Sequence, residues 1–246
     1  MESRHLLVHY TPSVFELSGK RVCVAGSTGF LGSWLVRELL SEGASVRGVS
    51  SSGGNQDALG IEAISADLRD FQQAFDVLSG QDAIVIAAAV TSGAQVMAQN
   101  PLAHLLDNVL INGALLRAAT LQGVKRVVFV SSSTVYPVGD WAMSEDDFTG
   151  DYFASYEVVA SMKLFAEEAC RHIGLHSETG AIVVRPGNAY GPWDHFDSEN
   201  SHVIPALVSR IARATSRLQV WGDGKDIKNF IHARDLARGI VQALQF

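Results

Sequence analysis

The chain has few of the features that mark several large classes of protein. It carries two cysteines among 246 residues, and the positions of Cys23 and Cys170 suggest neither a disulfide nor a metal-ligand spacing. We therefore expect two buried thiols and no metal site. Lysine and arginine do not cluster, and the net charge of −7 is spread along the chain. This pattern argues against nucleic acid or an anionic membrane as a partner, whereas a small anionic ligand depends on local groups and remains open.

Long apolar runs are also missing. The longest, such as residues 83–90, fall far short of the roughly 20 residues that span a bilayer. Residues 1–10, MESRHLLVHY, lack the basic start and long apolar core of a signal peptide. The sequence therefore predicts no membrane association and, by default, a cytoplasmic location. Apolar residues still make up 47% of the chain, enough for one large α/β domain with part of a second.

A glycine-rich motif is the most informative feature that is present. Residues 26–32 read GSTGFLG, directly after an apolar run and directly before a helical pattern. Gly26 permits a tight strand-to-helix turn, Gly29 lets the backbone approach a pyrophosphate, and Gly32 lets the helix pack closely on the strand. Phosphate charge then meets free N–H groups at the helix N-terminus. The motif predicts a dinucleotide site, and the alternative is an ordinary tight turn between a strand and a helix.

Strand-length apolar runs and helical patterns alternate along the chain. Beyond the first strand at 22–25, we expect strands at 44–49, 61–65, 83–89, 126–130 and 181–185, and helices at 71–78, 101–121 and 157–172. The run IVIAAA suits a parallel strand that is covered on both faces. The alternation predicts an α/β fold, a Rossmann-like doubly wound parallel sheet.

The composition changes from Pro186 onward to glycine, proline, asparagine, histidine and aspartate mixed with aromatic residues. We expect an N-terminal extension at 1–19, a dinucleotide-binding domain at 20–187, and a small substrate-binding segment at 188–228 with a helix at 204–214. Residues 229–246 then return to the main sheet, as a segment at 229–232 and a helix that begins near Ala233.

The end of the second strand bears on the choice of cofactor. NAD enzymes place a carboxylate there to hold the ribose hydroxyls, but here Val49 is followed by Ser50, Ser51 and Ser52, with Arg47 just before. Hydroxyl groups, together with Arg47, accept a 2′-phosphate better than a carboxylate does. The cofactor is predicted to be NADP or NAD, with NADP slightly favoured.

Several motifs together resemble one known family. The glycine loop, NAYGPWDHFDSENSHVIPAL at 188–207, VWGDG at 220–224 and SSSTVYP at 131–137 are similar to the extended short-chain dehydrogenase/reductases, the NAD-dependent epimerase/dehydratase family, and most of all to its GDP-L-fucose synthase branch. The resemblance covers the chain from Lys20, and relative to the family the substrate-binding part looks incomplete. It implies a nucleotide-sugar substrate and these cofactor-binding residues: Gly26, Thr28, Gly29, Phe30, Leu31, Gly32, Ser50, Ser51, Asp67, Leu68, Ala87, Ala88, Ala89, Asn108, Lys163, Pro186 and Asn188.

The resemblance also assigns roles in catalysis and substrate binding. Ser132 matches the serine that bonds the substrate carbonyl, Lys163 the lysine that binds the nicotinamide ribose, and His202 the acid/base of epimerisation. These roles fit the chemistry, because reduction of a ketone needs a donor aimed at the oxygen where charge develops. The substrate-contacting residues implied are Ser133, Thr134, Asn188, His202, Arg210, Trp221 and Lys228.

Two positions depart from the family pattern. The catalytic tyrosine of the family lies four residues before the lysine, and that position here is Val159. Tyr156 is the nearest tyrosine, but it lies two turns, roughly 10 Å, from Lys163 along a helix. Thr134 stands where the branch has a cysteine that acts as the second epimerisation base. A threonine hydroxyl does not ionise near neutral pH, so epimerisation by a cysteine and a histidine is in doubt.

The alternatives are structural. Ser132 could cap a strand end, His202 could be a polar residue with its hydrogen bonds satisfied, Lys163 could lie on the surface, and Tyr136 could pack in the core.

The favoured function is NAD(P)-dependent reduction or epimerisation of a nucleotide-linked 4-keto sugar. The proton would come from His202, a water bound to Ser132, or Tyr156. The rivals are a cofactor-binding sensor or scaffold without redox turnover, and a non-reducing epimerase. The resemblance further implies a homodimer through the helices at 101–121 and 157–172.

Overall fold

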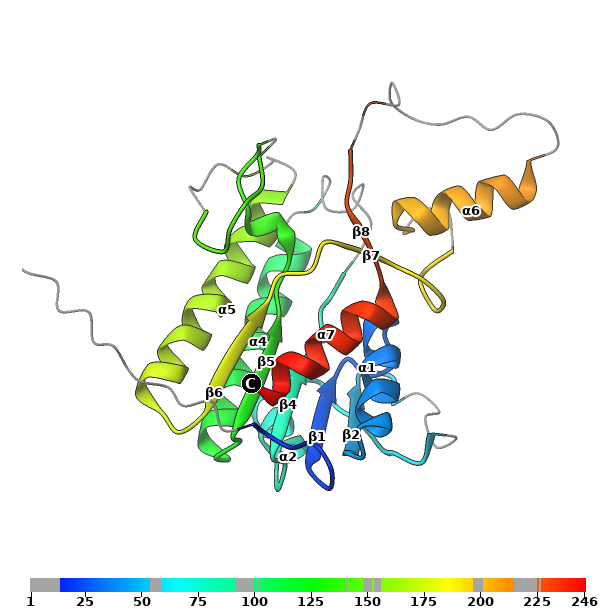
Figure 1. Ribbon diagram of the computed structural model, residues 1–246. Coiled ribbons are helices and arrows are strands. Elements are labelled where there is room, and N and C mark those ends of the chain that lie inside the picture. Colours follow the sequence, from blue (N-terminus) through cyan, green and yellow to red (C-terminus); the bar gives the residue numbers. More distant parts are fainter. Residues whose placement is uncertain are drawn as a thin grey trace, which may run out of the picture.

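A parallel sheet forms the centre of the computed structural model, which describes residues 14–53, 59–91, 100, 102–139, 141–147, 152, 156–196, 201–214, 225 and 227–246. Six strands pair in the order β3-β2-β1-β4-β5-β6, all parallel (Figure 1). Their bounds are β1 Arg21–Ala25, β2 Ser45–Ser50, β3 Glu62–Ser65, β4 Ala83–Ile86, β5 Arg126–Val130 and β6 Gly180–Val184. The predicted doubly wound sheet is confirmed, and its order reverses between β1 and β4, where such folds bind ligands beyond the carboxyl ends of the strands.

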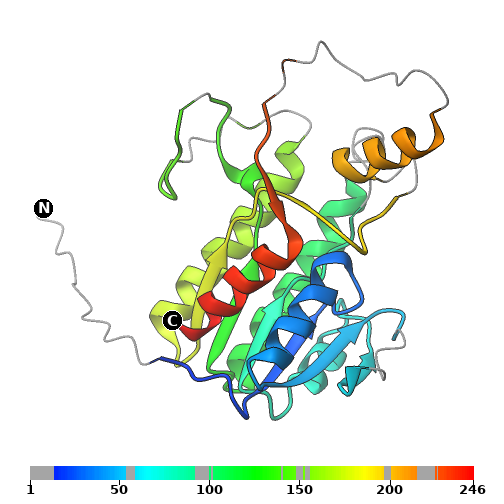
Figure 2. The ribbon, with the colours of Figure 1, turned by 45° about the vertical axis from the view of Figure 1, so that its right-hand side comes forward.

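Both faces of the sheet are buried, because successive side chains of a strand point to opposite faces. Cys23 and Ala25 face one core, and Val22 and Val24 face the other. The first core is closed by α2 (Phe71–Val77), α4 (Leu102–Leu121) and α5 (Glu157–His176), and the second by α1 (Phe30–Ser41) and α7 (Ala233–Gln245). Figure 2 shows α1 and α7 lying together across one face of the sheet. This arrangement explains why the strands read as continuous apolar runs.

The helices follow their predicted positions with one clear difference. Asp70 caps α2 by accepting a hydrogen bond from the N–H of Gln73 at 2.9 Å, as expected for a short acidic side chain at this position. Helix α5 runs past the predicted end at 172 to His176, so Gly174 lies inside the helix. The extension lengthens the helix that carries Lys163 without altering the placement of that residue.

The segment after β6 forms a smaller unit at the carboxyl edge of the sheet. Strand β7 (Asn188–Tyr190) pairs in parallel with β8 (Phe230–His232), and α6 (Val203–Arg213) stands apart from the main sheet (Figure 1). The prediction that the strand at 229–232 joins the main sheet is therefore wrong, because its backbone partner is β7. Helix α7 does return to the sheet and buries Leu236, Ile240 and Leu244 against it.

No helix in the described part of the chain is long and apolar enough to cross a membrane. No group of three or more histidine, cysteine, aspartate or glutamate side chains suited to a metal ion occurs among the same residues. Burial raises the pKa of both the Cys23 and Cys170 thiols to about 12, so both thiols stay protonated near neutral pH.

Candidate active site

The glycine loop between β1 and α1 has little room for side chains. Gly26 has a φ of +87°, and a Cβ built on it would lie 2.8 Å from the backbone of Ala88. A Cβ on Gly32 would lie 1.9 Å from the carbonyl oxygen of Gly26. Gly29 precedes α1 without any side-chain cap, so the first N–H groups of that helix are open to an anion. Thr28 is exposed at the tip of the loop, and Phe30 and Leu31 are half-buried at the start of the helix.

The end of β2 offers a hydroxyl group rather than a carboxylate. Ser50 is 7% exposed, and its Oγ is buried without a hydrogen-bond partner in the described structure. The carbonyl oxygen of Ser51 accepts a hydrogen bond from Ser65 Oγ at 3.1 Å. A buried polar atom without a partner carries a free-energy cost. The orphaned Ser50 hydroxyl and the tight cradle of Gly26 and Gly32 therefore both fit a bound dinucleotide.

Arg47 does not lie where the sequence analysis placed it. Its Nε donates to Glu62 at 2.8 Å, and its Nη1 donates to the carbonyl oxygens of Val77 and Ser79 at 2.9 and 3.0 Å. Those carbonyls lie at and just beyond the end of α2, away from the carboxyl edge of the sheet. The suggestion that Arg47 accepts a 2′-phosphate is wrong, because its fork of donors already binds these groups.

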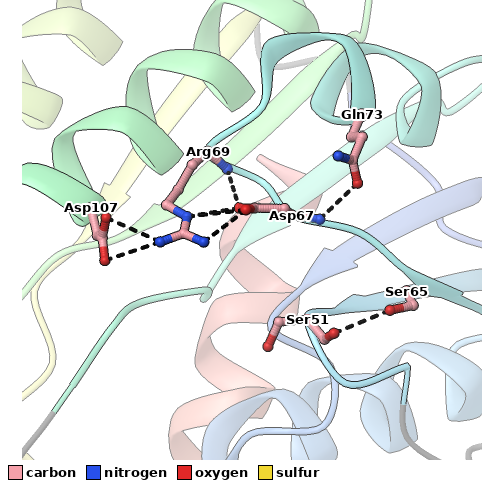
Figure 3. Close-up of polar contacts among 6 residues, drawn as sticks. All are labelled: Ser51, Ser65, Asp67, Arg69, Gln73 and Asp107. Atoms are coloured by element: carbon pink, nitrogen blue, oxygen red, sulfur yellow. Dashed lines mark hydrogen bonds and ion pairs between the residues drawn. The ribbon is translucent and has the colours of Figure 1, made fainter.

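Asp67 and Leu68 follow β3 at the edge where an adenine ring is expected. Arg69 binds both oxygens of Asp67, with Nε at 2.9 and 3.2 Å and Nη2 at 2.7 Å, and it also contacts Asp107 of α4 at 3.3 Å (Figure 3). These hydrogen bonds hold the pKa of the Asp67 carboxyl at about 2. Leu68 is buried, so Asp67 stays ionised and partly exposed while its neighbour anchors the loop.

Asn108 fixes the segment that follows β4. Its Oδ1 accepts from the N–H of Val90 at 2.9 Å, and its Nδ2 donates to the carbonyl oxygen of Val90 at 3.0 Å. Ala87 and Ala88 are half-buried beside the glycine loop, and Ala89 is exposed. These contacts give Asn108 a structural role at the edge of the site.

The end of β5 presents three hydroxyl side chains in sequence. Ser132 begins a short 3₁₀ turn, Ser133–Val135, and its Oγ accepts from the N–H of Thr134 at 3.2 Å. The alternative that Ser132 caps the strand end is therefore confirmed as a contact. This contact uses only one of the acceptor positions of the hydroxyl, so the hydroxyl proton can still be donated to a ligand. The Oγ1 of Thr134 is buried and has no hydrogen-bond partner in the described structure. Ser133 is half-buried beside them.

Lys163 reaches the same strand end from α5. Its Nζ donates to the carbonyl oxygen of Val130 at 2.7 Å and lies 4.9 Å from the centre of the Phe129 ring. Burial lowers the pKa of this amine from 10.5 to about 8, and the charge of Glu167 opposes the change. Lys163 is thus not a surface lysine. One turn before it, Val159 is half-buried, and Tyr156 lies at the N-cap of the helix.

Glu167 and Arg185 form a buried ion pair that sequence reasoning missed. Arg185 Nη2 lies 2.7 Å from Glu167 Oε2, and the two side chains are 11% and 10% exposed. Ser131 Oγ also donates to Glu167, and Arg185 donates to the carbonyl oxygen of Glu145 at 2.7 Å. The pair joins α5 to the ends of β5 and β6 and so supports both Ser132 and Lys163. The four-residue spacing between Lys163 and Glu167 could have pointed to Glu167 from the sequence, since it places both residues on one side of α5.

His202 lies at the N-terminus of α6 and has a partner that was also missed. Its Nδ1 lies 3.1 and 3.2 Å from the two oxygens of Asp194, a side chain with no exposed surface. The ring itself is 64% exposed. Ser201, just before it, has a buried Oγ without a hydrogen-bond partner in the described structure.

The remaining predicted residues are spread along the smaller unit. A cavity of about 310 Å³ lies between residues 184–187 and 229–231, and Pro186 is part of its wall. The Nδ2 of Asn188 donates to the carbonyl oxygen of Asn229 at 3.1 Å. Arg210 is half-buried on α6 and Lys228 is exposed before β8, while Trp221 lies outside the described residues. The structure thus groups Ser132, Thr134 and Lys163 at one strand end and places His202 and Arg210 on a separate helix.

Comparison with known proteins identifies the family. A sequence model of the NAD dependent epimerase/dehydratase family matches residues 22–246. A dTDP-4-dehydro-6-deoxy-D-allose reductase from a Streptomyces species is 31% identical over 243 residues, which cover 93% of this chain and 73% of that protein. A GDP-L-fucose synthase from Escherichia coli K12 is 28% identical over 237 residues, which cover 93% of this chain and 70% of that protein.

Solved structures share the fold. A GDP-L-fucose synthetase from Naegleria fowleri bound to NADP matches with a TM-score of 0.78 at 22% identity, over 95% of this chain and 75% of that chain. A UDP-glucose 4-epimerase from Thermotoga maritima with UDP-glucose matches with a TM-score of 0.79 at 21% identity, over 92% and 73%. With the fold, the glycine loop and the sequence match in agreement, the chain belongs to the NAD-dependent epimerase/dehydratase family of extended short-chain dehydrogenase/reductases.

Proposed function

We propose that the chain binds NADP and reduces or epimerises a nucleoside-diphosphate-linked 4-keto sugar. The observation that carries the proposal is the grouping of the Ser132 hydroxyl, the orphaned Thr134 hydroxyl and the buried Lys163 amine at the end of β5. This end lies in the same carboxyl edge of the sheet as the loop of Gly26 and Gly32. The names of the sequence relatives, a dTDP-keto-sugar reductase and a GDP-L-fucose synthase, point to the same substrate class.

Each group of residues has its own role in the proposed function. The glycine loop and the first turn of α1 hold a pyrophosphate, Ser50 and Ser51 face the adenosine ribose, and Asp67 and Leu68 border the adenine. Ser132 donates a hydrogen bond to the ketone oxygen, where negative charge develops during reduction. The bound nicotinamide supplies the hydride chemistry. Lys163, anchored on Val130, orients the ribose of the cofactor.

The absence of a carboxylate at the end of β2 supports NADP over NAD. Ser50 is buried with an unused hydroxyl, and no negative charge at that strand end repels a 2′-phosphate. Since Arg47 is engaged elsewhere, the preference rests on hydroxyl and backbone donors and is expected to be modest.

The proton donor differs from the family pattern. Val159 has no ionisable group, so the proton for the sugar oxygen comes from a water on Ser132, from His202, or from Tyr156. Loss of a positioned general acid typically costs ~10²- to 10⁴-fold in rate, which leaves a slow enzyme. A slow reductase, rather than a sensor or scaffold without turnover, is the function that the retained Ser132 and Lys163 support.

The test is a fluorescence titration with NADPH and NADH, followed by absorbance of the reduced nicotinamide during incubation with GDP- and dTDP-linked 4-keto sugars. We expect tighter binding of NADPH and slow oxidation that falls further in Ser132→Ala and Lys163→Met. Lys125→Met, an exposed lysine at the other end of β5, is the matched control and keeps the wild-type rate. Tight binding with no oxidation of either cofactor would instead favour a non-reducing epimerase or the sensor.

A homodimer through α4 and α5 forms part of the proposal. The two helices pack side by side, and α4 exposes Leu102, Leu106 and Leu110 by 59%, 61% and 53% at four-residue spacing, while Phe165 of α5 is 58% exposed. An apolar stripe of this kind marks an interaction surface. We expect sedimentation analysis to give a dimer that Leu106→Glu converts to a monomer, whereas Leu175→Glu, an exposed site near the end of α5, leaves it intact.

A further inference from the structure

The histidine and aspartate near the start of α6 have contrasting environments. Asp194 has a fully buried side chain, while the ring of His202 is 64% exposed. The contact is made by Nδ1 alone, which lies 3.1 and 3.2 Å from the carboxylate oxygens. An ionised carboxylate only accepts hydrogen bonds, so Nδ1 carries a proton in this contact, and in the neutral ring Nε2 then has a lone pair.

The turn that carries Asp194 is held in a strained conformation. Trp193 has a φ of +71°, which is rare for a bulky side chain. Its ring packs 4.6 Å from the ring of Trp34 and lies 4.1 Å from the guanidinium of Arg37. Asp194 itself accepts from the N–H of His195 at 2.8 Å. Strain of this kind persists only where the surroundings fix it, and it is concentrated at functional sites.

We propose that Asp194 is a positioning residue that holds His202 in the tautomer with a basic Nε2 facing the sugar. The inference rests on the proposed function and deepens it. During epimerisation, Nε2 takes the proton from the carbon beside the ketone, the C–H electron pair moves into a C=C bond, and the former carbonyl oxygen becomes an enolate that Ser132 stabilises. Protonation of the opposite face of that carbon by solvent restores the ketone with inverted configuration, whereas return of the proton from Nε2 to the same face regenerates the starting sugar. A ring with its proton on Nε2 cannot accept in this step.

The tautomer is measurable without any substrate. We expect ¹⁵N spectra of histidine-labelled wild type to show His202 protonated at Nδ1 and unprotonated at Nε2, with the signals assigned by their loss in His202→Gln. Asp194→Asn, whose amide can donate to Nδ1, shifts the ring toward the opposite tautomer. An Nε2-protonated His202 in the wild type overturns the proposal. This spectrum needs no altered Asp194, so it stands even if that variant does not fold.

The chemical test uses exchange of hydrogen beside the ketone of a GDP-linked 4-keto-6-deoxy sugar in heavy water. We expect Asp194→Asn to slow the exchange by ~10²- to 10⁴-fold with NADPH affinity unchanged. In the His202→Gln background the same substitution changes nothing further, because Asp194 acts through His202. If Asp194→Asn lowers the exchange rate by the same factor in the His202→Gln background, the proposal is overturned and Asp194 has only a structural role. If the wild type shows no exchange, epimerisation is refuted. The ¹⁵N spectrum alone then tests whether Asp194 sets the tautomer of His202.

Discussion

Removing the carboxylate of Glu167 tests how the site is supported. The side chain accepts from Arg185 Nη2 at 2.7 Å and from Arg185 Nε at 3.1 and 3.2 Å, and it also accepts from Ser131. Both charged side chains are close to 10% exposed. Glu167→Ala leaves the guanidinium buried without its counter-ion, which costs roughly 3–5 kcal/mol. With stabilities of about 5–15 kcal/mol for folded domains, this is a large fraction of the total.

The assay is urea unfolding followed by tryptophan fluorescence and circular dichroism. A loss of ~4 kcal/mol, with a urea m-value of about 2.5 kcal/mol/M, lowers the midpoint by about 1.6 M. Glu168→Ala is the matched control, since Glu168 is the next residue on α5 and pairs with Arg171 at 2.7 Å on the surface, both side chains being more than half exposed. We expect this exposed pair to leave the midpoint almost unchanged.

A double replacement separates the charge from the space it fills. Glu167→Met combined with Arg185→Met removes both buried charges and keeps most of the volume, and we expect it to be far more stable than Glu167→Ala. Equal midpoints for Glu167→Ala and Glu168→Ala would refute the reasoning, because they would mean that the Glu167 pair is hydrated. A double variant as unstable as the single one would show that packing, not the lone charge, sets the loss.

Three further predictions follow from the site. Burial lowers the pKa of Lys163 to about 8, so the unfolded chain binds more protons than the folded one between pH 8 and 10.5. The free energy of unfolding of the wild type should therefore rise by up to ~3 kcal/mol over that window relative to Lys163→Met. Urea unfolding at each pH measures this difference. Gly32→Ala should abolish NADPH binding by overlap with Gly26, whereas Gly239→Ala in α7, with open space around it, should gain ~0.5–1 kcal/mol. Val159→Tyr should raise turnover by ~10² or more without changing the product; an unchanged rate would show that the native site has its own proton donor.

Local sequence was enough for the central sheet and for the glycine loop. Strands such as β1 and β5 read as apolar runs because both of their faces are buried. The need for glycine at position 32 follows from backbone crowding against Gly26 inside the seven-residue motif, whereas Gly26 is crowded by the distant Ala88. Burial of both cysteine thiols was also predicted from local sequence, because Cys23 lies in the first strand and Cys170 in a helix, and both are buried.

Contacts between distant segments were beyond the reach of the same reasoning. Arg47 looked available beside the serines of β2, but its side chain binds carbonyl oxygens more than 25 residues later, at the end of α2. The segment at 229–232 was expected in the main sheet, but as β8 it pairs with β7; a sequence pattern gives the type of an element and not its partner. Glu167 of α5 meets Arg185, which directly follows β6. The helical spacing places Glu167 on the same side of α5 as Lys163, but nothing local identifies Arg185 as its partner.

The candidate site also combines local and distant contacts. Ser132 and Lys163 converge because adjacent elements of a regular fold, β5 and α5, bring them together. His202 depends on Asp194, whose turn depends on Trp193 packing against Trp34, a residue about 160 positions earlier in α1. Since α1 begins at the glycine loop, that aromatic contact ties the position of the histidine to the element that we propose binds the pyrophosphate. Under the proposed function, binding of the dinucleotide and placement of His202 as the base therefore depend on one connected set of contacts.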